Sequence, residues 1–487
     1  MRKNLILLIV ISLFVSSLKA EVGHSIKVSI KGWADSSIIL GHYFNKKLLV
    51  NDTIVLDKNG VGTFSGKEKL DGGMYLIYLP NKDIVDILID EDQTFDITTN
   101  KPDYIKNLII KGSDESKKFS DYQKFIAQMQ LEANPLREKI DKNKDNVDSV
   151  NFYRPQLEAL DVKVKAYWDD AITNNPKTLY TSFLLGIQEV KVPEPFVAFN
   201  NPKRDSIIQW NKYQYYKTHA FDNIDLSDPR MYLTPYLAGK IETFIGQTVF
   251  QIPDSVAKES VILIEKSRAN KQAFKYMLSM LFNLANESKI MGMDKVVVVL
   301  SEKYYLSGLA DWADKEFLTK LDDRVTKIKP NLVGNIAPEL KLQTFEEEII
   351  KLSEVSAPYT ILVFWEPECG HCQKEIPKLY NDVWLKYKDR GIKVVAVYTQ
   401  LKPEPWRKFI EEKSLADWIN VYDPYNLSNY RNTYDIYSTP IIYILDKEKR
   451  IMAKRIAVED IPGFFDHYLK SSNPDANKPI MKISDKL

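Results

Sequence analysis

The sequence predicts a multidomain protein with an N-terminal all-β domain, a central all-α domain and a C-terminal α/β domain. A chain of 487 residues is too long for one hydrophobic core. Short runs of β character fill the first part, apolar residues at helical spacing fill the middle, and strands alternate with helices at the end. We therefore expect domains at residues 21–112, 113–330 and 331–487.

Residues 1–20 have the pattern of a cleaved signal peptide. Arg2 and Lys3 provide a basic start, the range 5–15 is apolar, and the range 17–20 contains the small residues that a cleavage site needs. The apolar run is shorter than a helix that spans a bilayer, which favours cleavage over a membrane anchor. No cysteine follows the leader directly, which argues against a lipid anchor. We expect an exported, periplasmic protein.

The first domain is predicted to be an antiparallel sandwich or a small barrel, because its strand-like runs are short and regularly spaced. These runs cover residues 25–30, 37–43, 53–56, 74–79, 84–89 and 94–98. Residues 57–60 read Asp-Lys-Asn-Gly and predict a hairpin turn, since Asn-Gly tolerates the positive φ angles of such turns.

The middle of the chain has the spacing of helices. Phe119, Tyr122 and Ile126 recur at steps of three and four residues. Several prolines between 190 and 205 predict an internal linker. The β-branched run 296–300 fits either a strand or a helix, and its neighbours favour a helix.

The last part of the chain alternates strands with helices, which predicts an α/β sheet. The expected strands cover residues 359–365, 392–398, 441–445 and 451–456, the last two forming a hairpin. The expected helices cover residues 370–389, 405–412 and 460–469.

Cys369 and Cys372 are the only cysteines of the sequence. A disulfide between them closes a very small loop and removes little entropy from the unfolded chain, so we expect a chemical role. They follow an apolar strand and open a helix, whose N-terminus favours negative charge. We predict that Cys369 is the nucleophile, with a lowered pKa, and that Cys372 resolves the mixed disulfide. His371 is expected to stabilise the thiolate when protonated, the alternative being a solvated histidine.

Other uses of the cysteine pair lack the residues that they require. A structural zinc site needs about four cysteine or histidine ligands, and no second pair exists. Covalent haem attachment needs a histidine directly after the second cysteine, where this chain has Gln373. We therefore expect no metal and no cofactor. A net charge of +1 and the absence of a basic stripe argue against nucleic acid as a partner.

Three further features make residues 331–487 resemble the thioredoxin fold of exported TlpA/ResA-type thiol–disulfide oxidoreductases. Pro377 matches the proline that kinks the first helix, residues 334–338 (Gly-Asn-Ile-Ala-Pro) match the entry segment, and Thr439-Pro440 matches the cis-proline loop. The resemblance implies that Thr439 and Pro440 face the cysteines and bind the substrate backbone. It also implies cysteine-containing envelope proteins as partners and a membrane electron donor that keeps a reductase reduced.

The chain departs from the cytoplasmic thioredoxin pattern near the cysteines. Val363 replaces the buried acid six residues before the first cysteine, and Glu368 replaces the tryptophan just before it. The dipeptide between the cysteines is Gly-His, as in protein disulfide isomerase. Glu375 matches an acid that TlpA/ResA-type proteins keep on this helix, so it is a candidate proton acceptor for Cys372. The alternative is a solvated surface carboxylate.

Two other functions are considered beside the oxidoreductase. A thiol peroxidase carries proline and Thr/Ser upstream of its reactive cysteine, and alignment on Cys369 places Leu362 and Glu366 at those positions. A binding or scaffold protein gated by the redox state of the pair is the second alternative. The β and helical regions resemble domains of unknown function that precede exported thioredoxin modules, and this likeness assigns them no activity.

Overall fold

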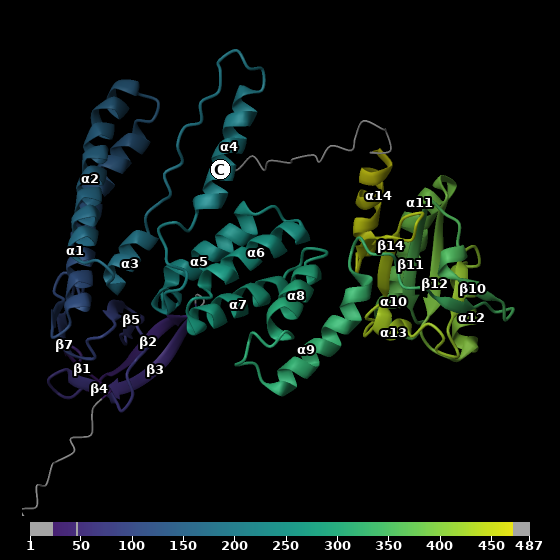
Figure 1. Ribbon diagram of the computed structural model, residues 1–487, viewed down its shortest axis with the longest axis horizontal. Helices are drawn as coiled ribbons and strands as arrows, with labels where there is room; N and C mark the ends of the chain where they lie inside the picture. The colour runs from purple at the N-terminus through teal and green to yellow at the C-terminus, as the bar shows by residue number, and fades with distance from the viewer. Residues whose placement is uncertain (1–22, 45–46, 471–487) are drawn as a thin grey trace, which may run out of the picture. The chain divides into compact units, whose positions relative to one another are not determined.

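The computed structural model describes residues 23–44 and 47–470, and these form two compact units. The first unit takes the chain up to residue 248 together with 263–277, and the second takes 249–262 together with the chain from residue 278 (Figure 1). The boundary between the units therefore runs through helices, not through the change of pattern near residue 330. The predicted signal peptide lies outside the described residues.

The N-terminal region forms two four-stranded sheets around one buried core. Its strands are β1 (His24–Lys31), β2 (Ser37–Phe44), β3 (Lys47–Val55), β4 (Val61–Gly66), β5 (Gly73–Tyr78), β6 (Ile84–Ile89), β7 (Thr94–Asn100) and β8 (Ile109–Lys111). The sheet orders are β4-β1-β7-β8 and β3-β2-β5-β6. The expectation of a purely antiparallel sandwich is wrong in one respect, because β1 and β7 are parallel.

The segment 57–60 forms a turn, but the predicted hairpin is wrong. The Asp57 carboxylate accepts hydrogen bonds from the backbone N–H groups of Asn59 at 2.8 Å and Val61 at 2.9 Å. Gly60 has a φ of 76°, a conformation that glycine adopts without strain. The turn joins β3 to β4, and these strands belong to different sheets. The Asn-Gly signal therefore locates the turn and not the strand pairing.

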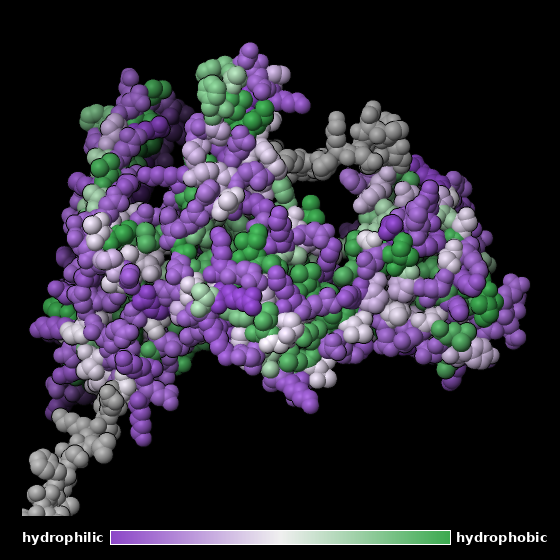
Figure 2. All heavy atoms as spheres, viewed as in Figure 1, coloured by the Kyte–Doolittle hydropathy of each residue, from purple (hydrophilic) through white to green (hydrophobic). Residues whose placement is uncertain are grey.

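Helices follow the β region, as predicted. They are α1 (Asp114–Lys142), α2 (Val147–Asn174), α3 (Leu179–Gly186), α4 (Arg204–His219), α5 (Pro235–Thr243), α6 (Pro253–Ser267), α7 (Lys271–Asn286), α8 (Asp294–Leu300) and α9 (Lys315–Ile328). The ambiguous run 296–300 is helical, and residues 189–198 have no regular secondary structure. Figure 2 shows hydrophilic residues over most of the visible face. No helix among the described residues combines the length and the apolar character needed to cross a bilayer.

The second unit contains the expected α/β sheet, in the order β10-β9-β13-β12-β11-β14-β15. Its strands are β9 (Lys341–Gln343), β10 (Ile349–Lys351), β11 (Tyr359–Trp365), β12 (Ile392–Tyr398), β13 (Ile419–Tyr422), β14 (Ile441–Leu445) and β15 (Ile451–Lys454). Its helices are α10 (Gly370–Lys378), α11 (Leu385–Tyr387), α12 (Pro403–Lys413), α13 (Tyr430–Thr433) and α14 (Ile461–Lys470). The expected hairpin is the antiparallel pair β14–β15, whereas β9, β10 and β13 were not expected.

Strand β11 lies inside this sheet and is buried on both faces. Ile361, Val363 and Trp365 belong to one hydrophobic cluster, while Leu362 and Phe364 belong to the cluster on the other face. This division follows from the alternation of side chains along a strand. Because packing on both faces fixes β11, the residues that follow it start from a rigid position.

The predicted helix over 370–389 is not continuous. Helix α10 ends at Lys378 and a π-helical turn follows over Leu379–Trp384. Pro377 has no N–H group for the carbonyl of Gln373, so the regular pattern of helical hydrogen bonds is interrupted there. The entry segment 334–338 pairs with the far edge of the sheet, since the N–H of Gly334 donates to the carbonyl of Ile451 at 2.8 Å.

A buried lysine connects the sheet to the helices of the same unit. Lys454 on β15 is 7% exposed and forms an ion pair with Asp294, which begins α8 and is 23% exposed. Its ammonium group also donates to the side-chain oxygen of Asn331 at 2.8 Å. Burial lowers the pKa of Lys454, and the nearby Asp294 carboxylate acts in the opposite direction.

We predict that Lys454→Met lowers the free energy of unfolding of this unit by about 3 kcal/mol, because Asp294 loses its cation while still partly buried. Urea unfolding followed by tryptophan fluorescence measures this. The double variant with Asp294→Leu should regain most of the loss. Lys408→Met breaks an exposed pair with Glu412 and serves as the control, with little expected change. Wild-type stability in Lys454→Met would contradict the prediction.

Candidate active site

Three chain segments meet at one edge of the second unit's sheet. Strands β11 and β12 are parallel, with Trp365 beside Tyr398, so their carboxyl ends reach the same edge. Strand β14 is antiparallel to β11, so its start lies at that edge too. The topology therefore brings together residues 366–372, residues 399–402 and the loop that ends at Pro440.

Cys369 is the N-cap residue of α10, where the chain turns from an extended to a helical conformation. Its backbone angles are φ −79° and ψ 119°, and its carbonyl accepts the first helical hydrogen bond from the N–H of Gln373 at 3.0 Å. The thiol is half-buried and donates to the carbonyl oxygen of Thr439 at 3.2 Å. The sulfur thus lies between the first turn of the helix and the loop before β14.

The surroundings of Cys369 favour its thiolate. Partial burial acts to raise the pKa of this thiol, but hydrogen bonds from Thr439 and from the backbone N–H groups of Cys372 and His371 outweigh it. The net result is a pKa below the ordinary value of a cysteine. Such N–H groups are free at a helix N-terminus, which explains why the first cysteine of the pair benefits.

Cys372 is in the opposite situation. Its side chain is fully buried in the hydrophobic cluster beneath α10. Burial raises its pKa to about 12, although a hydrogen bond from the backbone of Glu366 partly offsets this. Both thiols are free rather than joined in a disulfide. The pair therefore consists of one accessible thiol that ionises readily and one protected thiol that does not.

The peptide bond between Thr439 and Pro440 is cis, as the resemblance implied. The carbonyl of Thr439 accepts a hydrogen bond from the Cys369 thiol, and the Thr439 side chain acts to lower the pKa of both cysteines. The loop and the pair thus form one site. The binding of a substrate backbone by Thr439 and Pro440 stays a prediction.

This module matches a known family over residues 333–454, namely the AhpC/TSA family. Residues 24–119 match a domain of unknown function, DUF4369. The predicted thioredoxin-like fold of the C-terminal region is thereby confirmed.

Curated relatives of the AhpC/TSA domain carry the name thiol-disulfide oxidoreductase ResA. One from Bacillus thuringiensis subsp. konkukian is 24% identical over 149 residues, which are 31% of this chain and 83% of the relative. Another from Geobacillus kaustophilus is 28% identical over 145 residues, with 29% and 79% covered. These matches confirm the TlpA/ResA resemblance and the enzyme class, a thiol–disulfide oxidoreductase.

A solved domain of a "possible thiol-disulfide isomerase" from Cytophaga hutchinsonii is 47% identical to this chain. The match covers 29% of this chain and 96% of that domain, with a TM-score of 0.28. A thioredoxin-like protein from Bacteroides caccae is 18% identical, with 58% and 99% covered and a TM-score of 0.43.

Two predicted site residues of the AhpC/TSA domain lie near the pair without touching a sulfur through their side chains. The side chain of His371 is exposed, and its backbone N–H is the group that bonds toward Cys369. Glu375 accepts a hydrogen bond from Lys378 at 2.8 Å and forms an ion pair with it. The structure brings Glu375 to a lysine and not to Cys372, so its role as proton acceptor stays a prediction.

Glu366 is a site residue that the sequence analysis missed. It directly follows β11, and its carboxylate accepts a hydrogen bond from the Thr439 hydroxyl at 3.1 Å. The Gln400 amide also donates to it, and the Thr399 hydroxyl approaches it at 3.5 Å. The available signal was an acidic residue at the end of a buried strand, only three residues before the nucleophile. In the sequence, Glu366 stands out only as a mismatch to the peroxidase pattern.

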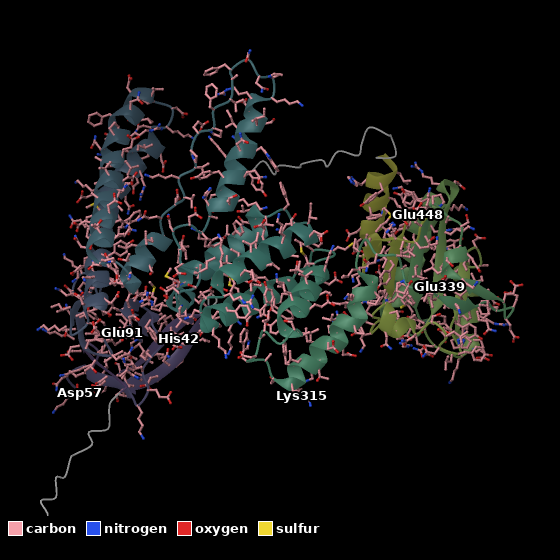
Figure 3. All side chains as sticks on the ribbon, in the orientation of Figure 1. His42, Asp57, Glu91, Lys315, Glu339 and Glu448 are labelled. Atoms are coloured by element: carbon pink, nitrogen blue, oxygen red, sulfur yellow. The ribbon has the colours of Figure 1, made fainter. Side chains whose placement is uncertain are left out.

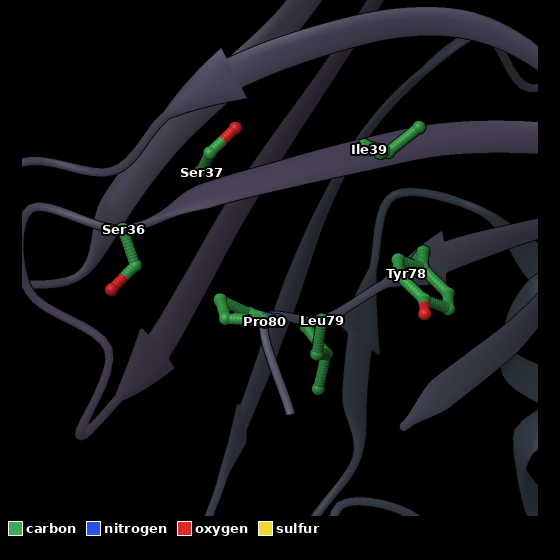
Figure 4. Close-up of a pocket in the computed structure, with 6 residues that line it drawn as sticks. All are labelled: Ser36, Ser37, Ile39, Tyr78, Leu79 and Pro80. Atoms are coloured by element: carbon green, nitrogen blue, oxygen red, sulfur yellow. The ribbon is translucent and has the colours of Figure 1, made fainter. Parts of the chain in front are cut away.

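Two other features belong to the first unit. His42 on β2 (Figure 3) bonds to the side chain of Asn51 at 2.6 Å, an ordinary cross-strand contact. A pocket of about 360 Å³ in the DUF4369 region is lined mainly by apolar atoms of β2, β5 and their loops (Figure 4). It belongs to the first unit, whereas both cysteines belong to the second.

We predict that iodoacetamide at neutral pH modifies only Cys369 in the reduced protein, because this thiol is accessible and ionises first while Cys372 is buried. The rate should rise with pH and level off above the pKa of Cys369, well before Cys372 ionises. Mass spectrometry of digests identifies the modified residue. The Cys369→Ser variant should stay unmodified, and equal labelling of both cysteines in the wild type would overturn the assignment.

Proposed function

We propose that the chain is an exported thiol–disulfide oxidoreductase that exchanges or reduces disulfides of envelope proteins through Cys369 and Cys372. The observation that carries the proposal is the unequal state of the two thiols. Cys369 is half-buried with a lowered pKa, whereas Cys372 is fully buried with a pKa near 12. An attacking thiol and a protected resolving thiol need this difference.

The reaction follows from these two positions. The Cys369 thiolate attacks one sulfur of the substrate disulfide, forms a mixed disulfide and releases the other substrate sulfur as a thiolate. Cys372 then loses its proton and attacks the sulfur of Cys369. The second substrate thiolate leaves, and a disulfide joins Cys369 to Cys372. Two electrons pass from the pair to the substrate, and a dithiol reductant restores the pair.

The direction and place of action rest on sequence features. We assign the reducing direction and a membrane electron donor from the TlpA/ResA resemblance. The envelope location rests on the basic start and apolar run of residues 1–20. The mature protein should therefore begin near residue 21.

The alternative activity as a thiol peroxidase has less support. In a peroxidase the Thr/Ser hydroxyl of the motif lies beside the reactive cysteine, and the matching position here holds the carboxylate of Glu366. The matching proline position holds Leu362, which is fully buried in β11. A redox-gated scaffold is the other alternative, and catalytic turnover separates it from an enzyme.

We predict that the wild-type protein accelerates the reduction of insulin by dithiothreitol, and that Cys369→Ser reduces the rate to the uncatalysed value. The acceleration follows from the accessible thiolate, which reacts faster than the free reductant. The assay measures insulin precipitation as turbidity. Absence of turnover in the wild type would favour the scaffold.

A trapping experiment then tests the roles of the two cysteines and the substrate class. We expect Cys372→Ser to accumulate mixed disulfides with envelope proteins, because the resolving thiol is missing, and Cys369→Ser to trap nothing. Non-reducing gels and mass spectrometry identify the captured proteins and the cysteine that holds them. Capture by Cys369→Ser in place of Cys372→Ser would reverse the roles.

A further inference from the structure

Glu366 connects the three segments that form the site. It follows β11, accepts a hydrogen bond from the Gln400 amide in the segment after β12, and accepts another from the Thr439 hydroxyl in the loop before β14. The Thr399 hydroxyl lies 3.5 Å from it, but its shorter bond, at 3.2 Å, goes to the carbonyl of Trp365. All of these donors are neutral groups. No lysine or arginine among the described residues forms an ion pair with this carboxylate, although other acids of the unit have such partners.

The Thr439 hydroxyl has only one proton to give. A threonine side chain contributes one O–H donor, and its oxygen otherwise accepts. The Thr439 hydroxyl donates to the Glu366 carboxylate at 3.1 Å, and the Thr439 carbonyl accepts from the Cys369 thiol at 3.2 Å. A hydrogen bond from the same Thr439 side chain acts to lower the pKa of Cys369. When the proton points to Glu366, the hydroxyl presents its lone pairs to the sulfur. The carboxylate and the thiolate therefore compete for the same proton.

We propose that Glu366 is a positioning residue that draws the Thr439 proton away from Cys369 and thereby keeps the reduced pair a stronger electron donor. A carboxylate is a better acceptor than a neutral group, because hydrogen bonds to charged partners are roughly twice as strong. The Cys369 thiolate is then less stabilised than it would be with the hydroxyl proton. A less stabilised thiolate makes the reduced pair transfer its electrons more readily.

The other charged groups named around the site do not accept a hydrogen bond from the Thr439 hydroxyl. Arg431 on α13 donates to the backbone carbonyl of Thr399 at 2.6 Å, so it fixes the neighbouring segment. Glu368 has an exposed side chain on the helix approach, where water screens its charge. The side chain of His371 is exposed as well. Among these groups, Glu366 alone has a hydrogen bond that ends on the Thr439 hydroxyl.

The test replaces the acceptor without changing the size of the side chain. In Glu366→Gln we expect the ratio of thiolate to thiol at Cys369 to rise about tenfold at a given pH below its midpoint. Ultraviolet absorbance of the thiolate during a pH titration measures this ratio. Equilibration with glutathione at a pH above that midpoint should show the pair becoming harder to oxidise by about tenfold, or about 30 mV for two electrons.

Glu368→Gln is the matched control, since it removes the same charge one residue before Cys369 from an exposed position. We expect a much smaller shift in both measurements. Thr439→Val removes the shared hydroxyl, and in that background Glu366→Gln should have no more effect than Glu368→Gln. An effect that survives Thr439→Val, or equal effects of the two glutamine variants, would show a general charge effect and overturn the proposal.

The inference rests on thiol–disulfide exchange at the pair and deepens the proposed function, but the two fail in different ways. If the wild-type cysteines form no disulfide with glutathione, the proposed function fails. If the wild type equilibrates normally and Glu366→Gln leaves the titration and the equilibrium unchanged, only the role of Glu366 fails. Far-ultraviolet circular dichroism of each variant shows that the fold is intact.

Discussion

The position of the Cys369 sulfur between a helix N-terminus and the carbonyl of Thr439 is the constraint on which the site depends. The helix supplies backbone N–H groups that favour negative charge, and the cis-proline loop supplies a hydrogen-bond acceptor and a hydroxyl. Neither segment produces this environment alone. It exists because a parallel strand ends, and an antiparallel strand begins, at the same edge of one sheet.

Hydrophobic packing below the site holds the segment that carries Cys369 in place. Strand β11 is buried on both faces and lies between β12 and β14. Its packing therefore fixes the point from which residues 366–369 leave the sheet. Cys372 contributes to the same cluster, and its burial raises its pKa. Burial of the second thiol therefore serves both the packing of α10 and the difference in reactivity between the two cysteines. The hydrophobic core and the chemistry of the pair depend on the same residues.

The sequence predicted the parts of this structure that depend on local pattern. An apolar run predicted β11, the Cys-x-x-Cys spacing predicted the pair, and Thr439-Pro440 predicted the cis loop. The contacts that depend on distant partners were not predictable in this way. Asn59-Gly60 located a turn but did not show that the strands beside it join different sheets. Nothing local in the sequence indicated that Asp294 pairs with Lys454 across 160 positions.

The same reasoning explains why the sequence analysis named Glu375 and not Glu366. Glu375 matches the position of an acid that TlpA/ResA-type proteins keep on this helix. Its side chain forms an ion pair with Lys378, one turn along the helix. Glu366 matches no such position, and its partner Thr439 is 73 residues away.

A carboxylate at position 363 would lie in the hydrophobic cluster beneath the cysteines, where carrying a charge is costly. Position 366 is only partly buried, so a charge costs less there, and the side chain meets a hydroxyl rather than a sulfur. Moving the acid from the interior of β11 to its end changes its expected action. In the interior an acid would exchange protons with Cys372 directly, whereas at the end of the strand it acts on Cys369 through the one proton of Thr439.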